Sequence, residues 1–558
     1  MSNKKSRVKA KIKQKQKIQK KAKNSVKRQN SQQIAQKTSP FLVAVAQINS
    51  NAGDINENAR KIIATIDKAK QNNAQLVIFP ELTVTGWPVE DLLLRPDFID
   101  KNMQKFIEIV NATKGISCIF GFVNKANKSV YNAVAYVKDQ KIMGIGNKIH
   151  PTNLFTSEQI SDIFTDGTKR IGIVIANDTE EDNTIQQLIA KGIDMLVIIS
   201  TSQYSLNKDP EQYILPLAKK YTIPVIYCNS VGSQSGIIYS GGSFVTDKNG
   251  TVIVRAKKFG EEIVLADISK SGTLFTPQKN QIEEVYSALT LGIRDYFAKT
   301  GHQKALVAIS GGLDSSVTAA LAVHSLGKEN VMGLFLPSKI TSKESVQDAK
   351  RICTALGIEW KTISIDSYVT PFAKAAGLKY EKKNISFIEQ NIQARVRAHL
   401  LMIYANKNNL LLLSSLNKTD IATGYFTMYG ESVGAFLPLG DLWKSDVMKI
   451  AQYINKQKRI IAESILKKQP SAELRPNQKD SDDLPQYEIL DKILELYVVQ
   501  KKDIYEITKM GFDSDMVHKI AYLVMKNEFK RRTLPFSIAI TSCSFNSMKL
   551  PVVSGWKG

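Results

Sequence analysis

The chain has 558 residues, of which 43% are hydrophobic, and carries a formal net charge of +24 at pH 7. This length exceeds what one hydrophobic core supports, and it predicts roughly two to four domains. No apolar run is long enough to cross a membrane and no signal-peptide core is present, so we expect a cytoplasmic protein without a membrane span. The four cysteines are widely scattered, which excludes a CxxC metal pair and a disulfide framework.

The first 40 residues form a strongly basic segment. They contain fourteen Lys or Arg residues and no acidic residue, so they carry more than half of the positive excess. A Lys- and Gln-rich segment with almost no large apolar residue cannot bury enough surface to offset the entropy of ordering, and we expect residues 1–40 to be a disordered tail. Contact with RNA or an anionic membrane, an organelle address, and a merely solvated tail all remain open.

Strand and helix patterns then alternate up to residue 270. Apolar runs at 41–48 and 76–79 predict buried strands, and an apolar face over 55–71 predicts a helix between them. Further strands are predicted at 116–123, 130–137, 171–175, 195–200 and 225–228, before a β-rich stretch over 241–268. This alternation predicts a layered α/β domain over residues 41–270, followed by a linker and leading helix over 271–290.

The second half, residues 291–558, repeats the alternation. Strands are predicted at 305–309, 331–336, 360–365 and 410–414, and helices at 343–356, 387–406 and 444–455. Short apolar runs separated by helical periods favour a doubly wound parallel sheet, whose ligands bind beyond the carboxyl ends of the strands. Residues 487–532 read as helical, and the last residues as irregular and basic.

A phosphate-binding loop is predicted at Ser310-Gly311-Gly312-Leu313-Asp314-Ser315-Ser316, between a strand and a helix. We expect Gly311 and Gly312 to adopt backbone angles that a Cβ would oppose, so that successive N–H groups converge on an anion at a positive helix start. The serine hydroxyls add further donors. The pattern lacks the Walker spacing and resembles the SGGxDS signature of N-type ATP pyrophosphatases, which cleave ATP between its α- and β-phosphates. A Gly-Ser turn without function is the alternative.

Two motifs of the first half resemble the nitrilase superfamily of amidases. They are Phe79-Pro80-Glu81-Leu82-Thr83 and Gly146-Asn147-Lys148. The resemblance implies an α-β-β-α sandwich in which Glu81 accepts the proton of a cysteine nucleophile and Lys148 steadies the oxyanion. The residue that follows the next strand, where the family has that cysteine, is Ala176.

A methyl group cannot form an acyl-enzyme, so the resemblance implies a fold without its amidase reaction. An engineered Cys-to-Ala change and natural loss both remain open, and the further departure at Asn177 favours natural loss. Cys118 and Cys228 lie in apolar strands, and we expect both to be inert core thiols and not relocated nucleophiles.

The second half resembles the synthetase domain of glutamine-dependent NAD⁺ synthetases. Separated motifs carry this resemblance: Pro337-Ser338-Lys339, the segments 344–349 and 389–397, Asn417-Lys418-Thr419-Asp420, Gly424-Tyr425-Phe426-Thr427-Met428-Tyr429-Gly430, and the segment 472–478. With the nitrilase-like half, the resemblance covers nearly everything after residue 40. It implies a nitrilase-like domain followed by an adenine nucleotide alpha hydrolase-like domain of the N-type ATP pyrophosphatase class, and a homo-oligomer.

The resemblance implies that ATP adenylates deamido-NAD⁺ with release of pyrophosphate, and that a nitrogen donor then expels AMP. Ammonia is the expected donor because the glutaminase nucleophile is missing; glutamine is the alternative. Two sets of binding residues are implied, for ATP and pyrophosphate (Ser310, Gly311, Gly312, Asp314, Ser315, Ser316, Lys339, Thr427, Lys444) and for deamido-NAD⁺ (Arg395, Asp480, Lys530). Asp314 and Asp420 are the candidate Mg²⁺ ligands, since that ion prefers hard oxygen donors. Arg397, two residues from Arg395, points to another side of the helix, so we do not expect both to touch one phosphate. A ligand contact and a solvated helix charge both remain open for Arg397.

Two other functions remain open. The same loop could adenylate a different acceptor, as in GMP synthetases and tRNA-thiolating enzymes, although the motifs downstream argue against this. A protein of another class, an RNA-binding or scaffolding protein, could act through the basic tail with both sites decayed. Retention of all glycines and serines in the loop argues against that second alternative.

Overall fold

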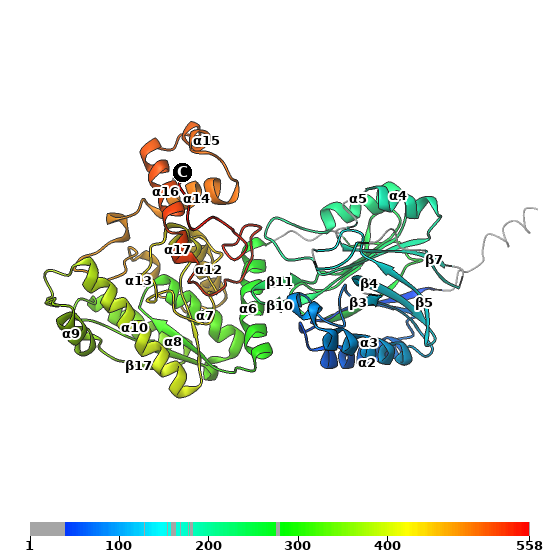
Figure 1. Ribbon diagram of the computed structural model, residues 1–558, viewed down its shortest axis with the longest axis horizontal. Coiled ribbons are helices and arrows are strands. Elements are labelled where there is room, and N and C mark those ends of the chain that lie inside the picture. The colour runs from blue at the N-terminus through cyan, green and yellow to red at the C-terminus, as the bar shows by residue number, and fades with distance from the viewer. Residues whose placement is uncertain are drawn as a thin grey trace, which may run out of the picture.

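A computed structural model gives the structure of residues 40–556, apart from 128, 153, 158–162, 168, 177, 179–181 and 275–279. These residues form two lobes that lie side by side, with helix α6 (Gln281–Thr300) at the junction between them (Figure 1). The predicted basic tail lies outside the described residues, except for Pro40. The boundary predicted after residue 290 falls inside α6.

The N-terminal lobe contains two six-stranded sheets, with strand orders β14-β1-β2-β3-β4-β5 and β13-β12-β9-β8-β7-β6. The first sheet consists of β1 (Leu42–Gln47), β2 (Leu76–Ile78), β3 (Ser117–Ala126), β4 (Ser129–Lys138), β5 (Lys141–Asn147) and β14 (Glu262–Asp267). The second consists of β6 (Phe164–Asp166), β7 (Lys169–Ile175), β8 (Met195–Ser200), β9 (Val225–Asn229), β12 (Phe244–Thr246) and β13 (Val252–Arg255). Strands β10 (Val231–Gln234) and β11 (Ile237–Ser240) form a separate hairpin.

Alternation along the strands explains the layers. In β1, Val43 and Val45 pack between the two sheets with Ile173 of β7, whereas Ala44 and Ala46 pack on the outer side against helices α2 (Ile55–Gln71) and α3 (Pro96–Ala112). Helices α4 (Asp182–Ala190) and α5 (Glu211–Tyr221) cover the outer face of the second sheet. The resulting four layers confirm the predicted α-β-β-α sandwich.

The C-terminal lobe is built on a parallel sheet with strand order β17-β16-β15-β18. Its strands are β15 (Ala305–Ile309), β16 (Val331–Phe335), β17 (Glu359–Thr362) and β18 (Leu411–Leu413). Helices α6, α7 (Leu313–Leu326), α8 (Lys343–Leu356) and α12 (Lys444–Gln457) share the core on one face, and α9 (Asp366–Ala375) and α10 (Phe387–Asn408) share the core on the other. Helices on both faces confirm the doubly wound sheet.

Shorter helices complete the C-terminal lobe. They are α11 (Lys418–Thr423), α13 (Glu463–Lys467), α14 (Tyr487–Leu494), α15 (Ile504–Lys509), α16 (Ser514–Lys526) and α17 (Glu528–Arg531). Among the described helices, none combines the length and apolar composition that a membrane crossing needs.

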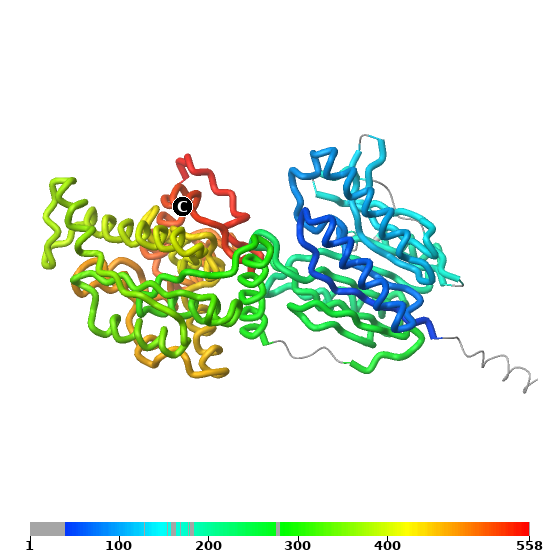
Figure 2. The backbone as a smooth tube through the Cα atoms, turned by 90° about the horizontal axis from the view of Figure 1, so that it is seen from below, coloured from blue at the N-terminus to red at the C-terminus, as the bar shows by residue number. Residues whose placement is uncertain are grey.

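Helix α6 packs against both lobes, as the view from below also shows (Figure 2). On the side of the N-terminal lobe, Asn49 Nδ2 donates to Asp295 Oδ2 at 2.7 Å, and Lys299 Nζ donates to the Ser233 carbonyl at 2.9 Å. On the other side its apolar residues enter the core that surrounds β15 and α7. One helix therefore connects the lobes both covalently and by packing.

Candidate active site

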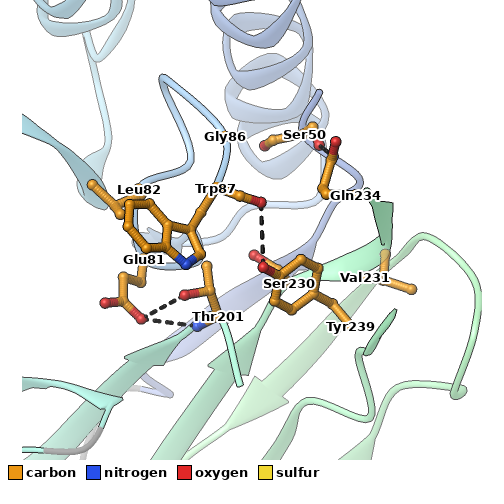
Figure 3. Close-up of a pocket in the computed structure, with 10 residues that line it drawn as sticks. All are labelled: Ser50, Glu81, Leu82, Gly86, Trp87, Thr201, Ser230, Val231, Gln234 and Tyr239. Atoms are coloured by element: carbon orange, nitrogen blue, oxygen red, sulfur yellow. Dashed lines mark hydrogen bonds between the residues drawn. The ribbon is translucent and has the colours of Figure 1, made fainter. Parts of the chain in front are cut away.

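Glu81 lies buried just beyond β2, with all of its hydrogen-bonding capacity engaged (Figure 3). Its Oε1 accepts from Lys148 Nζ and from Asn132 Nδ2, both at 2.7 Å. Its Oε2 accepts from the backbone N–H and the hydroxyl of Thr201, at 2.9 and 2.8 Å. Burial acts to raise the pKa of Glu81, but Lys148 and the other donors outweigh it and hold the pKa below its usual value. The structure thus brings together the predicted base and the predicted oxyanion lysine.

Ala176 directly follows β7, with φ of +38° and 8% of its surface exposed. Residues other than glycine rarely adopt positive φ, and such strain gathers at functional sites. Nearby, the Asp178 carboxylate accepts from the backbone N–H groups of Ile149 and His150, at 3.0 and 2.9 Å. Asn177 lies outside the described residues. The strained corner and the segment after Lys148 are therefore both present, but the residue at the corner carries only a methyl group.

A cavity of about 10 Å³ lies beside Glu81, which is room for roughly one water molecule. It is lined by Ser50, Glu81, Leu82, Gly86, Trp87, Thr201, Ser230, Val231, Gln234 and Tyr239 (Figure 3). The Tyr239 hydroxyl closes one side by donating to the Trp87 carbonyl at 3.3 Å. Cys118 and Cys228 are completely buried, and burial raises the pKa of both thiols, which confirms them as inert core residues.

The predicted phosphate loop joins β15 to the N-terminus of α7. Gly311 has φ of +75°, and a Cβ there would collide with the carbonyl oxygen of Ser345. Ser310 Oγ lies 2.9 Å from Ser315 Oγ and accepts from Gly312 N–H at 3.1 Å. Gly312 itself has φ of −98°, which any residue can adopt, so the expectation of a special backbone angle holds for Gly311 and is wrong for Gly312.

Charged side chains converge beside this loop. Lys444 Nζ contacts Asp314 Oδ2, and Asn417 Nδ2 donates to Asp314 Oδ1 at 3.3 Å. Burial, followed by the charge of Asp314, raises the pKa of Asp420 well above its usual value. Burial opposes the charge of Lys444, but Asp314 and Asp420 outweigh it and raise the pKa of Lys444. One lysine therefore lies among several carboxylates that repel one another.

This carboxylate cluster suits a hard cation. Tyr487 donates to Asp480 Oδ2 at 2.8 Å, whereas Asp480 Oδ1 is buried without a hydrogen-bond partner in the described part of the chain. Oxygen donors with surplus negative charge fit Mg²⁺ carried in with nucleotide phosphates. The described residues contain no group of three or more His, Cys, Asp or Glu side chains arranged to hold a metal on their own. A Mg²⁺ ion at this cluster would therefore need further ligands besides the carboxylates.

Three other predicted residues meet at the segment 424–431. Thr427 Oγ1 donates to Asn391 Oδ1 at 2.8 Å, Arg395 Nε donates to the Met428 carbonyl at 3.2 Å, and Lys530 Nζ donates to the Gly424 carbonyl at 2.8 Å. Lys339 lies apart from this group and from the loop serines, because its Nζ donates to the Tyr380 carbonyl at 2.6 Å and sits over the Tyr380 ring. Arg397 turns inward and donates to the Leu336 carbonyl at 3.0 Å, which excludes the solvated helix charge among its two alternatives.

Sequence reasoning gave no role to several polar residues that hold these sites together. They are Asn132 and Thr201 at Glu81, and Asn417 and Tyr487 at the carboxylates. Thr201 and Asn417 each follow a buried strand closely, and a polar residue in that position is a signal that could have been used. Asn132 and Tyr487 lie inside a strand and at a helix start, where the pattern carries no such signal.

Two family models match the chain, one to each lobe. A carbon–nitrogen hydrolase model matches residues 42–277, and an NAD synthase model matches residues 285–534. The glutamine-dependent NAD⁺ synthetase of Acinetobacter baylyi is 34% identical over 537 residues, which cover 93% of this chain and 99% of that relative. The chain belongs to the glutamine-dependent NAD⁺ synthetase family.

Other NAD⁺ synthetases of this family agree. The glutamine-dependent NAD⁺ synthetase of Synechocystis is 34% identical over 552 residues, covering 92% of this chain and 99% of that relative. A solved glutamine-dependent NAD⁺ synthetase from Acinetobacter baumannii, in complex with ADP, is 33% identical with a TM-score of 0.74 and covers 93% of this chain and 99% of that one. The chain is accordingly an ATP-dependent carbon–nitrogen ligase of NAD⁺ synthesis.

Proposed function

We propose that this chain converts deamido-NAD⁺ to NAD⁺ with ATP and free ammonia, and that its nitrilase-like domain does not release ammonia from glutamine. The single observation that carries the proposal is Ala176 at the strained corner after β7, where an amidase needs a thiolate. By contrast, the loop from Ser310 to Ser316 keeps its serine hydroxyls together at the start of α7, where they can serve as donors to a phosphate.

In the first step, a carboxylate oxygen of deamido-NAD⁺ attacks the α-phosphorus of ATP, and the bond to the β-phosphate oxygen breaks. The leaving pyrophosphate accepts hydrogen bonds from the loop, for which we assign Ser310, Gly312, Ser315 and Ser316, with Gly311 shaping the turn. Lys444 neutralises developing charge, since it already contacts Asp314 at this edge. Mg²⁺, when bound through Asp314 and Asp420, supplies charge neutralisation on the phosphates.

In the second step, ammonia attacks the carbonyl carbon of the acyl-adenylate, AMP departs with the bonding electrons, and the nitrogen loses a proton. We assign Thr427, Arg395 and Lys530 to the binding of the dinucleotide, because they gather around one segment next to the carboxylate cluster. The partly unpaired carboxylate of Asp480 is assigned to a polar group of the same substrate. Lys339 reaches a phosphate only after leaving the Tyr380 carbonyl.

A nitrogen-donor assay tests the proposal. Purified full-length chain with ATP, Mg²⁺ and deamido-NAD⁺ should form NAD⁺ with ammonium chloride and form none with glutamine. Glutamine with an added, separate glutaminase should restore synthesis, which controls for inhibition by glutamine. Equal rates with ammonium and with glutamine would refute the loss of the amidase reaction. Absence of NAD⁺ formation with ammonium chloride would refute the whole proposal.

A further inference from the structure

Residues 536–541, which we call the strap, hydrogen-bond to both lobes. On the C-terminal lobe, Leu437 N–H donates to the Phe536 carbonyl at 3.0 Å. On the N-terminal lobe, Ala539 N–H donates to the Gly236 carbonyl at 2.8 Å, and Leu206 N–H donates to the Ile540 carbonyl at 2.9 Å. Ile538, Ala539 and Ile540 are all buried. The strap thus behaves as a short strand shared by two domains; it belongs to the dark red segment beside α6 in Figure 1.

Ser537 is the most closely held residue of the strap. A Cβ on Gly236, in the β10–β11 turn, would collide with the Ser537 carbonyl oxygen, and a Cβ on Gly440 would collide with the Ser537 side chain. Asn546 holds the same residue from a third direction, since it accepts from Ser537 N–H at 2.8 Å and donates to its carbonyl at 2.7 Å. The strap therefore has very little freedom to shift against either lobe.

A chain of contacts connects the strap to the carboxylate cluster. The Asp441 carboxylate accepts from the N–H groups of Ile540 and Thr541, at 2.8 and 2.7 Å. It also pairs with Lys418 Nζ at 2.8 Å, and neither side chain of this ion pair is exposed. Lys418 adjoins Asn417, whose side chain bonds Asp314 and also caps α11 by accepting from the N–H groups of Thr419 and Asp420.

We infer that the nitrilase-like domain is a brace for the synthetase site, acting through the strap and the Asp441–Lys418 ion pair. Asp441 and Lys418 are positioning residues that fix Asn417, and through it Asp314 and the first turn of α11. A buried ion pair tolerates little displacement, because separating its members leaves two uncompensated charges. This role goes beyond the synthetase reaction and gives the nitrilase-like domain a function that needs no amidase chemistry. It rests on the synthetase function and not on the choice of nitrogen donor.

The test uses one added methyl group on the nitrilase-like lobe. Gly236→Ala pushes against the strap and touches neither site, whereas Gly115→Ala places a methyl in open space at nearly the same φ, +79° against +83°. ATP–pyrophosphate exchange dependent on deamido-NAD⁺ reports adenylation without any nitrogen donor. Exchange by the unmodified chain is measured first, and its absence would contradict the synthetase function, separately from the brace.

We expect Gly236→Ala to raise the KM for ATP about tenfold, and Gly115→Ala to leave it unchanged. Hydrogen exchange should accelerate at the Thr419 and Asp420 amides in the first variant only. A loss of folded protein alone would lower the rate without changing KM. If both glycine variants have the same KM and the same amide exchange, the brace is refuted. Asn546→Ala, which removes both hydrogen bonds to Ser537, should reproduce the shift if Gly236→Ala does not fold.

Discussion

Ala176 has a positive φ, a backbone conformation that an alanine side chain disfavours. An L-residue in the left-handed region costs about 1–2 kcal/mol, and only the surroundings maintain it here. Asp178 contributes, since its carboxylate holds the segment that follows Lys148. The corner after β7 is thus determined by the fold around it, and a side chain as small as a methyl group does not relax it.

The contacts around Glu81 set the expected outcome of Ala176→Cys. The variant should not hydrolyse glutamine, because both oxygens of Glu81 remain engaged by Lys148, Asn132 and Thr201 and because Asn177 also departs from the family pattern. Glutamate release from glutamine, followed with and without the synthetase substrates, is the measurement. Unmodified chain is the control. A stoichiometric burst of glutamate would show that the missing thiol was the only defect.

At the scale of single residues, the sequence predicted which motifs lie near one another better than which atoms their side chains contact. The pairing of Glu81 with Lys148 follows from the motif, but the bond of Lys339 to the Tyr380 carbonyl does not. The residues that neighbour Arg397 in the sequence do not indicate that its side chain turns inward to Leu336. Long side chains have several rotamers, and the choice depends on neighbours that are distant in sequence.

The loop before α7 is the element on which the proposed adenylation depends most directly. Its turn needs Gly311 for two reasons, a φ of +75° and the backbone of Ser345 next to the missing Cβ. Gly311→Ala should therefore displace the loop against α8, and we expect kcat/KM for ATP to fall roughly a hundredfold. Steady-state kinetics with ammonium as nitrogen donor measure this.

Two other glycines control for this substitution. Gly301→Ala carries the same strain, with φ of +74°, but meets no atom within 4 Å, so it should cost only about 1 kcal/mol of stability and leave kcat/KM unchanged. Gly312→Ala has an ordinary φ and should be milder than Gly311→Ala. Equal losses in Gly301→Ala and Gly311→Ala would mean that unfolding, and not loop position, sets the activity.

Elements with a strong period were predicted closely. The helix expected at 387–406 is found at Phe387–Asn408, where a capping box of Ser386 and Glu389 fixes its start. The strand expected at 360–365 is shorter and lies at Glu359–Thr362, because its pairing with β16 ends there. The hairpin β10–β11 and the strap were not predicted, since both are short and the strap pairs only with distant segments.

At the scale of the whole molecule, Lys299 lies at the junction of the lobes, where its side chain is largely buried. It donates to Asn49 Oδ1 at 2.7 Å and lies 3.5 Å from Asp295 Oδ2. Burial nevertheless dominates and lowers the pKa of Lys299 to about 8. The unfolded chain keeps this proton up to an ordinary lysine pKa, so between these values the unfolded state binds more protons. Stability from this group must then rise with pH.

We predict that the free energy of unfolding gains about 2 kcal/mol from Lys299 between about pH 7.5 and about pH 9.5. Urea titrations at the two pH values measure it, and the gain should be missing from Lys299→Met. Lys68→Met, on the exposed face of α2, should keep the pH dependence of the unmodified chain. An identical pH dependence in Lys299→Met would contradict the burial of a titrating lysine at the junction.

The two-lobe arrangement itself was foreseen, but its junction was not. A boundary expected after residue 290 assumes that α6 belongs to one side, whereas Asp295 and Lys299 bond the N-terminal lobe from its last turns. A helix that packs against two lobes has both apolar and polar faces in contact with protein. The hydrophobic pattern of the sequence does not tell which face contacts which lobe.

The lobes are joined by two sets of contacts, along α6 and along the strap, and neither requires the peptide bonds between residues 274 and 280. If the backbone were cut there, the fragments would remain associated through the same hydrogen bonds and buried side chains. The two lobes in this sense resemble the subunits of a heterodimer that are joined in one polypeptide. Two genes could encode its halves without altering the interface, and a gene fusion needs only to supply a connection of sufficient length.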